Sequence, residues 1–259
     1  MQLCLDIGNT HLSGGVFENN NLLLQFRYDS KHVGTSDELG VFLRSVLREN
    51  EIDYNNINHI GIASVVPSID YTIRAACIKY LNHEPLFLQP GIKTGLQIRM
   101  PHPNEVGADL IAGAIAAKQI APNKDILIFD LGTATTCCYL NSRGEFMGGA
   151  IAPGIRLMME SLQANTAKLF GVDIIKPELT TGKTTKTAIQ SGIYHAQLGF
   201  IEKLIHNFTL ENNMPAKPVV FATGGFSNLF TTDKVFDKIV PELVLLGVKI
   251  MLDLNQTVN

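Results

Sequence analysis

The chain has 259 residues, with 21 lysines and arginines against 24 aspartates and glutamates, and 46% of it is hydrophobic. This length corresponds to roughly one or two domains of about 100–200 residues each. The hydrophobic share can fill a buried core, which excludes a disordered chain. A net charge of -3 without any basic run excludes general nucleic-acid binding, which needs a positively charged surface.

Membrane and secretion signals are also absent from the sequence. No apolar run approaches the roughly 18 residues of a membrane-spanning helix, and the N-terminal residues 1–6 include Asp6 where a signal peptide is apolar. The four cysteines show no CxxC spacing. We therefore expect a cytoplasmic protein with no membrane partner, whose cysteines are reduced and buried.

A strand-like run ending in Asp-apolar-Gly-polar occurs twice, at residues 3–10 and 127–134. Each copy continues into two further strand-like runs separated by turns. These runs are residues 15–17 and 22–26 after the first copy, and residues 136–140 and 145–147 after the second. The copies begin about half a chain length apart. The sequence therefore predicts a duplicated domain, each half opening with a β-meander.

The remaining segments alternate between helical and strand patterns. Apolar residues at a period near 3.6 predict a helix over residues 37–50. In chain order, we further expect a strand at 57–66, helices at 67–81, 108–119, 154–170 and 186–212, a strand at 219–223 and a helix at 242–254. Residues 171–186, rich in Pro, Gly and Thr, predict a mobile loop. The predicted fold is α/β, with domains at residues 1–117 and 118–259.

The first Asp-Gly turn has the composition of a phosphate-binding loop. Asp6 ends a strand and could hold Mg2+, while Gly8 allows a close approach of the backbone to an anion. Asn9 and Thr10 add amide and hydroxyl donors for phosphate oxygens. A single motif of this kind is more often an ordinary Asx turn of a hairpin.

The second copy of this motif favours a phosphate-binding loop over an ordinary Asx turn. Asp130 and Thr133 occupy in the second copy the positions that Asp6 and Asn9 occupy in the first. Two such loops that face a cleft would bind a nucleotide between them. Gly224-Gly225 follows another apolar strand and is a third candidate contact for phosphate or adenosine. Together, the three elements resemble the superfamily of actin, hexokinase and heat-shock chaperone ATPases. That resemblance implies two duplicated ribonuclease-H-like domains with a central cleft.

Nearly the whole chain is similar to the type III pantothenate kinase family, which includes the Bvg accessory factor. The motifs that carry this resemblance lie at residues 6–10, 63–67, 103–109, 130–136, 148–154, 190–192 and 223–225. The resemblance implies ATP-dependent phosphorylation of pantothenate to 4'-phosphopantothenate, the first step of coenzyme A biosynthesis. It also implies a homodimer, with the phosphate loop and catalytic aspartate in the first domain and the nucleotide and dimer side in the second.

The resemblance assigns roles to individual residues. Asp6 would organise Mg2+ or another divalent cation with the ATP phosphates, and Asp130 would hold K+ or NH4+. Asp109 would be the general base, and Thr185 would contact pantothenate in the same pocket as Gly107 and Ala108. From the residues themselves, Asp109 opens a predicted helix whose positive end would keep it ionised, although a helix-capping aspartate is the plainer interpretation.

Two positions depart from the family pattern. Leu110 stands where the family has an arginine, and Met100 stands near the place of an expected pocket tyrosine. Leucine cannot replace a guanidinium's charge or its planar donors, so another cation, Arg99 or Lys183, would have to substitute. The alternative is a catalytically weakened paralogue that binds nucleotide or pantothenate as a regulator. A kinase for another small alcohol or for polyphosphate is a further alternative.

Overall fold

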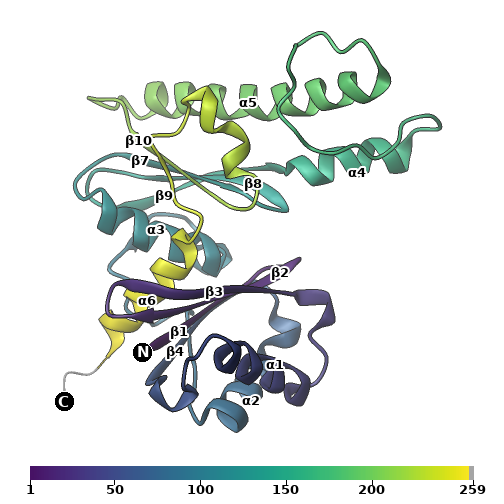
Figure 1. Ribbon diagram of the computed structural model, residues 1–259. Helices are drawn as coiled ribbons and strands as arrows, with labels where there is room; N and C mark the ends of the chain where they lie inside the picture. Colours follow the sequence, from purple (N-terminus) through teal and green to yellow (C-terminus); the bar gives the residue numbers. More distant parts are fainter. Residues whose placement is uncertain (257–259) are drawn as a thin grey trace. The chain divides into compact units, whose positions relative to one another are not determined.

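A computed structural model describes residues 1–256, which form two compact units (Figure 1). The first unit comprises Met1–Leu96, Pro101–Ala116 and the segment that begins at Glu242. The second comprises Gln97–Met100 and Ala117–Pro241. The domain boundary predicted from the sequence places all of residues 118–259 in the second domain. The structure differs there because the last helix packs on the sheet of the first unit.

The sheet of the first unit has five strands in the order β3-β2-β1-β4-β5. β1 pairs antiparallel with β2 and parallel with β4, and β2 pairs antiparallel with β3. The strands are β1 (Gln2–Ile7), β2 (His11–Glu18), β3 (Asn21–Asp29), β4 (His59–Ser64) and β5 (Leu86–Phe87). β1 is the central strand, and its side chains alternate between two buried faces.

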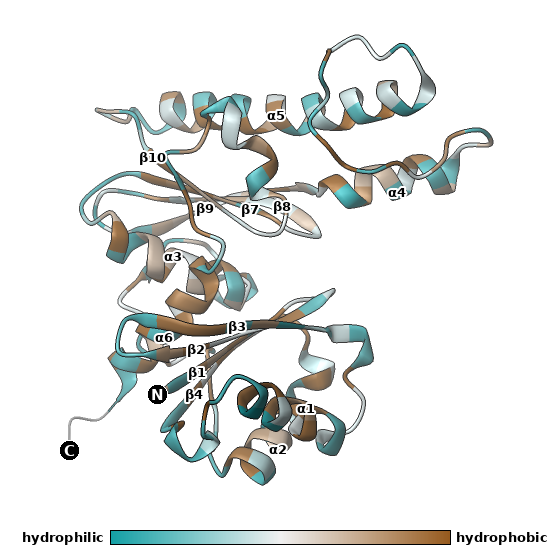
Figure 2. Cartoon of the chain, viewed as in Figure 1, coloured by the Kyte–Doolittle hydropathy of each residue, from teal (hydrophilic) through white to brown (hydrophobic). Residues whose placement is uncertain are grey.

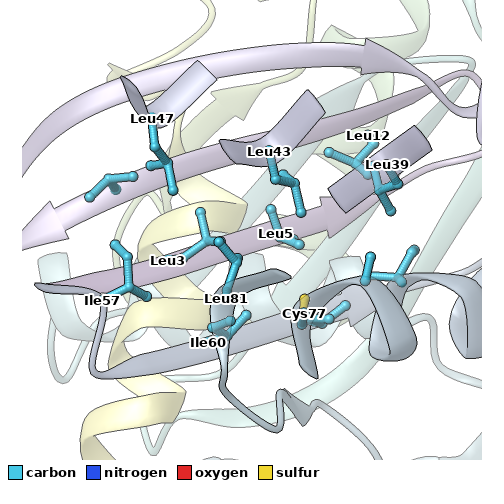
Figure 3. Close-up of a cluster of buried hydrophobic side chains, with 14 of the residues drawn as sticks. Leu3, Leu5, Leu12, Leu39, Leu43, Leu47, Ile57, Ile60, Cys77 and Leu81 are labelled. Carbon is cyan, nitrogen blue, oxygen red and sulfur yellow. The ribbon is translucent and has the colours of Figure 1, made fainter. Parts of the chain in front are cut away.

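One face of this sheet packs on α1 (Ser36–Glu49) and α2 (Pro67–Leu81). Leu3 and Leu5 of β1 point toward the leucines of α1 and toward α2 (Figure 3). Burial of each such leucine contributes about 1.5–3 kcal/mol to the free energy of folding, relative to an exposed side chain. Thr35 begins α1 through a capping box with Glu38, which satisfies backbone donors of the first turn. Both helices were predicted from the sequence, and the structure confirms them.

The other face of the same sheet carries Cys4 and packs on α3 (Ala108–Ile120) and α6 (Leu243–Asn255). These two helices approach closely, since a Cβ at Gly247 would lie 1.8 Å from the Ala112 carbonyl oxygen. Only glycine permits this contact, which fixes α3 beside α6. Figure 2 shows the hydrophobic residues concentrated along α6 and the strands of this sheet. Asp109 lies at the start of α3.

The sheet of the second unit repeats the first one. Its strand order is β11-β10-β7-β8-β9-β6, in which β7, β8 and β9 form the meander and β10 pairs parallel with β7. The strands are β6 (Gln97–Ile98), β7 (Ile126–Leu131), β8 (Ala134–Leu140), β9 (Glu145–Pro153), β10 (Val219–Thr223) and β11 (Lys238–Ile239). The predicted duplication is confirmed, with β6 added at the edge of β9.

Two helices, α4 (Ile155–Asn165) and α5 (Thr185–Glu211), cover one face of the second sheet (Figure 1). α4 is shorter than the predicted 154–170. The connecting residues 166–184 form no helix or strand, but two side chains of α5 hold them. Gln190 Nε2 donates to the Asp173 carbonyl at 2.9 Å, and Ser191 Oγ donates to the Thr180 carbonyl at 2.5 Å.

All four cysteines, Cys4, Cys77, Cys137 and Cys138, are buried, as predicted. Burial raises the pKa of each thiol for which a shift is resolved: Cys4, Cys77 and Cys137. Within residues 1–256, no helix combines the length and apolarity that crossing a bilayer requires.

Candidate active site

Asp6 is the penultimate residue of β1, beside Ser13 on β2 and Ala63 on β4. The turn that follows is closed by a hydrogen bond from the Gly8 amide to the His11 carbonyl at 3.0 Å. A Cβ at Gly8 would stand 3.3 Å from that carbonyl oxygen, a tight contact that glycine avoids. Asn9 at the tip is exposed, so the loop offers polar groups to a ligand.

The residues around Asp6 suit a magnesium ion held jointly with phosphates. Within the described chain, no three or more His, Cys, Asp or Glu side chains gather into a metal-binding group. Mg2+ is commonly bound by one or two carboxylates, with the remaining positions taken by substrate phosphates and water. A single carboxylate beside the Ser13 hydroxyl fits that arrangement and does not fit a metal held by protein ligands alone.

Asp109 is the second residue of α3, and its Oδ1 accepts a hydrogen bond from the Leu110 amide at 2.7 Å. From the sequence, the positive end of the helix is predicted to keep this carboxylate ionised. In the structure, burial is the larger influence and raises the pKa of Asp109, although the backbone hydrogen bonds act in the opposite direction. A carboxylate with a raised pKa is a stronger base than an exposed one.

Val65 connects the Asp6 loop with the start of α3. Its amide donates to the Ile7 carbonyl at 3.0 Å, and its Cγ1 would lie 3.5 Å from a Cβ placed on Gly107. The first unit therefore brings the predicted phosphate loop and the predicted base to the two sides of one residue. Val65 belongs to the motif at 63–67, but nothing in the sequence indicated this bridging position.

Gly107 makes room for the Asp109 carboxylate. A Cβ at Gly107 would lie 2.4 Å from Asp109 Oδ1, closer than atoms can approach without a shift. We expect Gly107→Ala to displace the carboxylate and lower kcat by about tenfold or more, because small displacements of a reacting group are costly. Steady-state kinetics with a melting curve checks this. Gly113→Ala in the same helix is the control, since its nearest neighbour would stand at 3.9 Å.

Of the other predicted substrate residues, Ala108 and Leu110 belong to the first unit and Met100 belongs to the second. Ala108 and Leu110 flank Asp109 on α3 and are half-buried, and Ala108 packs against the core beside α6. Met100 follows β6 in the second unit. Arg99, one of the two cations considered as substitutes for the arginine missing at position 110, donates to the buried Glu145. The Arg99 guanidinium is therefore already paired with a carboxylate within the second unit.

The Glu145 cluster is a structural feature of the second unit. Asn141, Arg99 and Arg143 all donate to the Glu145 carboxylate, which is only 7% exposed. These hydrogen bonds lower the pKa of Glu145 to about 2. Arg99 directly follows β6, so its hydrogen bond to Glu145 joins this edge strand to the meander.

In the second unit, Asp130 occupies on β7 the place that Asp6 occupies on β1. It pairs with Thr136 on β8 and with Thr223 on β10, and paired residues direct their side chains to the same face of a sheet. The Thr136 Oγ1 is buried and has no hydrogen-bond partner among the described residues. A carboxylate flanked by two hydroxyls, one of them unsatisfied, is a donor set for a hard cation.

Gly224 packs directly on Asp130. Its φ is +85°, and a Cβ would lie 2.4 Å from Asp130 Oδ1 and within 2.7 Å of the Leu131 backbone. The Phe226 amide donates to the Leu131 carbonyl at 3.1 Å, which joins the two segments. Thr133 and Gly225 are exposed beside them. The structure thus brings Asp130 and the Gly-Gly turn together, although the sequence separates them widely.

Thr185 is the first residue of α5, directly after its N-cap Thr184. It is exposed and lines a mostly apolar groove of about 700 Å³ between α4 and α5. Other residues that line the groove include Leu157, Met158, Ala188 and Gly192. Gly182 lets the preceding loop cross the first turn of α5, because a Cβ there would lie 2.3 Å from the Ala188 amide.

The repeated strand order, with an aspartate and a glycine turn at the same place in each unit, defines the fold of the actin-like ATPase class. Solved structures share this fold. A ROK family glucokinase from Streptomyces griseus, solved with glucose and AMPPNP, matches with a TM-score of 0.55 and 10% identity over 96% of this chain and 98% of that one. A conserved Baf family protein from Campylobacter jejuni matches with a TM-score of 0.62 and 18% identity over 98% of both chains.

Sequence comparison gives the family. The family model of type III pantothenate kinase matches residues 2–207. Curated proteins with that name are 48% identical in Legionella pneumophila, over 98% of this chain and 99% of the relative, and 46% identical in Elusimicrobium minutum, over 100% of both. The chain belongs to the type III pantothenate kinase family.

Proposed function

We propose that this protein phosphorylates pantothenate with ATP to give 4'-phosphopantothenate, the first step of coenzyme A biosynthesis. Family membership across the whole chain carries the proposal. The half-buried Asp109 beside the phosphate loop supplies the local chemistry that it requires. These findings favour an active kinase over the regulatory paralogue that was considered from the sequence.

Asp109 acts as the general base in this proposal. The primary hydroxyl oxygen of pantothenate attacks the γ-phosphorus of ATP, the bond from that phosphorus to the β–γ bridging oxygen breaks, and ADP leaves. The hydroxyl proton passes to the Asp109 carboxylate. Because phosphoryl transfer has a loose transition state, placing the reactants matters more than base strength. Gly107 and the Leu110 amide hold the carboxylate in place.

Asp6, Gly8, Asn9 and Thr10 bind the phosphates in this proposal, and Asp6 holds the divalent cation. When bound, Mg2+ supplies positive charge against the triphosphate. Thr133, Gly224 and Gly225 contact the nucleotide in this proposal. Met100, Gly107, Ala108, Leu110 and Thr185 belong to the pantothenate site.

Asp130 holds K+ or NH4+ in this proposal, with Thr136 and Thr223 as hydroxyl neighbours. We expect Asp130→Asn to raise the K+ concentration for half-maximal activity by about tenfold or more, because a charge-assisted contact is lost. A K+ titration at constant ionic strength, balanced with choline chloride, measures the shift. An unchanged titration curve would place the cation elsewhere.

The resemblance to the type III pantothenate kinase family implies the assembly, and the charge, apolar runs and cysteines of the sequence predict the location and the partners. The protein acts as a cytoplasmic homodimer, with ATP and pantothenate as small-molecule partners and without nucleic acid or membrane. Sedimentation of the purified chain tests the dimer.

ADP release coupled to NADH oxidation tests the reaction itself. The assay contains Mg2+, K+ and ATP, and mass spectrometry identifies the phosphorylated product. Glucose or polyphosphate in place of pantothenate, with ATP retained as the donor, tests the alternative reactions. We expect turnover that requires pantothenate. Binding of ATP or pantothenate without any turnover would contradict the proposal and favour the regulatory alternative.

A further inference from the structure

Ser30 contacts the Asp6–Thr10 loop through both of its donors. It is the first residue of the short 3-10 helix η1 (Ser30–His32), which follows β3, and is only 7% exposed. Its Oγ donates to the Gly8 carbonyl at 2.7 Å, and its amide donates to the Thr10 carbonyl at 3.0 Å. One buried residue thus satisfies the carbonyl oxygens on both sides of Asn9.

These bonds determine the direction in which the loop presents its charges. A trans peptide is planar, so its carbonyl and N–H point in opposite directions. Because the Gly8 carbonyl points to Ser30, the N–H of exposed Asn9 points away from Ser30. An anion site needs N–H groups directed at the ligand and carbonyl oxygens directed elsewhere. Ser30 imposes that orientation on the Gly8–Asn9 peptide.

The turn that holds Ser30 is itself built independently of the loop. The Asp29 carboxylate accepts from the Lys31 amide at 2.9 Å and lies 3.1 Å from His32 Nδ1. The Val33 amide donates to the Ser30 carbonyl at 3.3 Å. Ser30 is therefore held by a capped turn at the end of β3, and the Asp6–Thr10 loop is hydrogen-bonded to Ser30.

We infer that Ser30 is a positioning residue for phosphoryl transfer, which keeps the Asp6–Thr10 loop in its phosphate-binding conformation. The inference rests on the proposed function of that loop. Ser30 does not touch the nucleotide in this account. It acts through the carbonyl oxygens of Gly8 and Thr10.

Three substitutions of Ser30 distinguish the effect of its hydroxyl group from the effect of its side-chain volume. Ser30→Ala removes the Oγ donor, Ser30→Cys keeps the size but leaves a weak donor, and Ser30→Thr keeps the hydroxyl. We expect the first two to raise the KM for ATP about tenfold, the effect of one hydrogen bond to a well-placed loop. The KM for pantothenate should change less than about twofold, and Ser30→Thr should restore most of the ATP affinity.

Thr35→Ala is the matched control, because it removes a nearby hydroxyl that accepts from the Glu38 amide at 3.2 Å and does not contact the loop. It should lower the melting temperature and leave the KM for ATP unchanged. If Ser30→Ala and Ser30→Cys change the melting temperature but not ATP affinity, Ser30 is merely structural and the inference is wrong.

Calorimetric binding of Mg-ATP, without pantothenate, separates this inference from the proposed function. A wild-type chain that binds Mg-ATP more tightly than Ser30→Ala supports the role of Ser30 even if pantothenate is not phosphorylated. Equal binding by the two proteins overturns it even if pantothenate is phosphorylated. A wild-type chain that binds no Mg-ATP would overturn both the role of the loop and that of Ser30.

Discussion

Asp109→Asn is expected to lower kcat by about 10²–10⁴-fold, the contribution of a well-placed general base. The KM for ATP should change little, since the proposed contact of Asp109 is with the pantothenate hydroxyl. Asparagine has the same shape and still accepts from the Leu110 amide, which reaches Oδ1 at 2.7 Å in the wild type. Single-turnover kinetics with saturating substrates measures the loss.

The pH dependence provides a second test of Asp109. A base must be deprotonated, and burial raises the pKa of Asp109. The acidic limb of wild-type kcat should therefore lie at a higher pH than for an ordinary aspartate, and the limb should vanish in Asp109→Asn. A pH profile of kcat for both proteins measures this, and an unchanged limb in the variant would remove Asp109 from the role of base.

Stability should change in the opposite direction from activity. Folding raises the pKa of Asp109. Its contribution to the free energy of unfolding is therefore fully present when the pH is below its pKa in the unfolded chain. That contribution is lost as the pH rises through its pKa in the folded protein. At neutral pH the buried charge is therefore a cost that asparagine removes. Asp109→Asn should melt at the same temperature as wild type or higher near pH 7, and the difference should disappear at acidic pH.

Asp37→Asn is a matched control for Asp109→Asn. Asp37 is also the second residue of a helix, α1, but it is exposed and accepts from Lys79 at 2.7 Å. That hydrogen bond lowers the pKa of Asp37, so its stabilising effect is present above its unfolded pKa and is lost as the pH falls. The control should retain full activity. Loss of activity in both variants would indicate a general effect of helix N-terminal charge.

Asp6→Asn has the second large expected effect. Loss of the carboxylate should lower kcat by about 10²–10³-fold, the usual cost of removing one group that stabilises transition-state charge. The Mg2+ concentration for half-maximal activity should also rise, because a neutral amide is a poorer ligand for Mg2+. A Mg2+ titration at fixed ATP measures both changes.

Asp53→Asn is the control for this substitution, since Asp53 caps a 3-10 turn through the Asn55 amide at 2.9 Å and has no contact with the β1 loop. It should leave the Mg2+ requirement unchanged. An Asp6→Asn protein whose activity and Mg2+ curve equal those of wild type would show that Asp6 does not organise the cation.

The sequence determined the duplication and the motif residues, because both are local patterns. The period-3.6 pattern located α1, and two strand-turn-strand copies predicted the paired sheets that the structure contains. Asp6 and Asp130 could be matched because each ends a strand before a glycine. The short strands β5, β6 and β11 have two residues each, too few to show a period, so no sequence pattern predicts them.

Only the tertiary structure decided the features that depend on residues far apart in the chain. Burial raises the pKa of Asp109 against the expected influence of its helix end, Arg99 is paired with Glu145, and Ser30 reaches Gly8 from the end of another strand. α6 packs on β1 and β4, so the C-terminal segment belongs to the first unit. Desolvation and hydrogen bonding arise from neighbours in space, and a pattern of residues along the chain does not contain them.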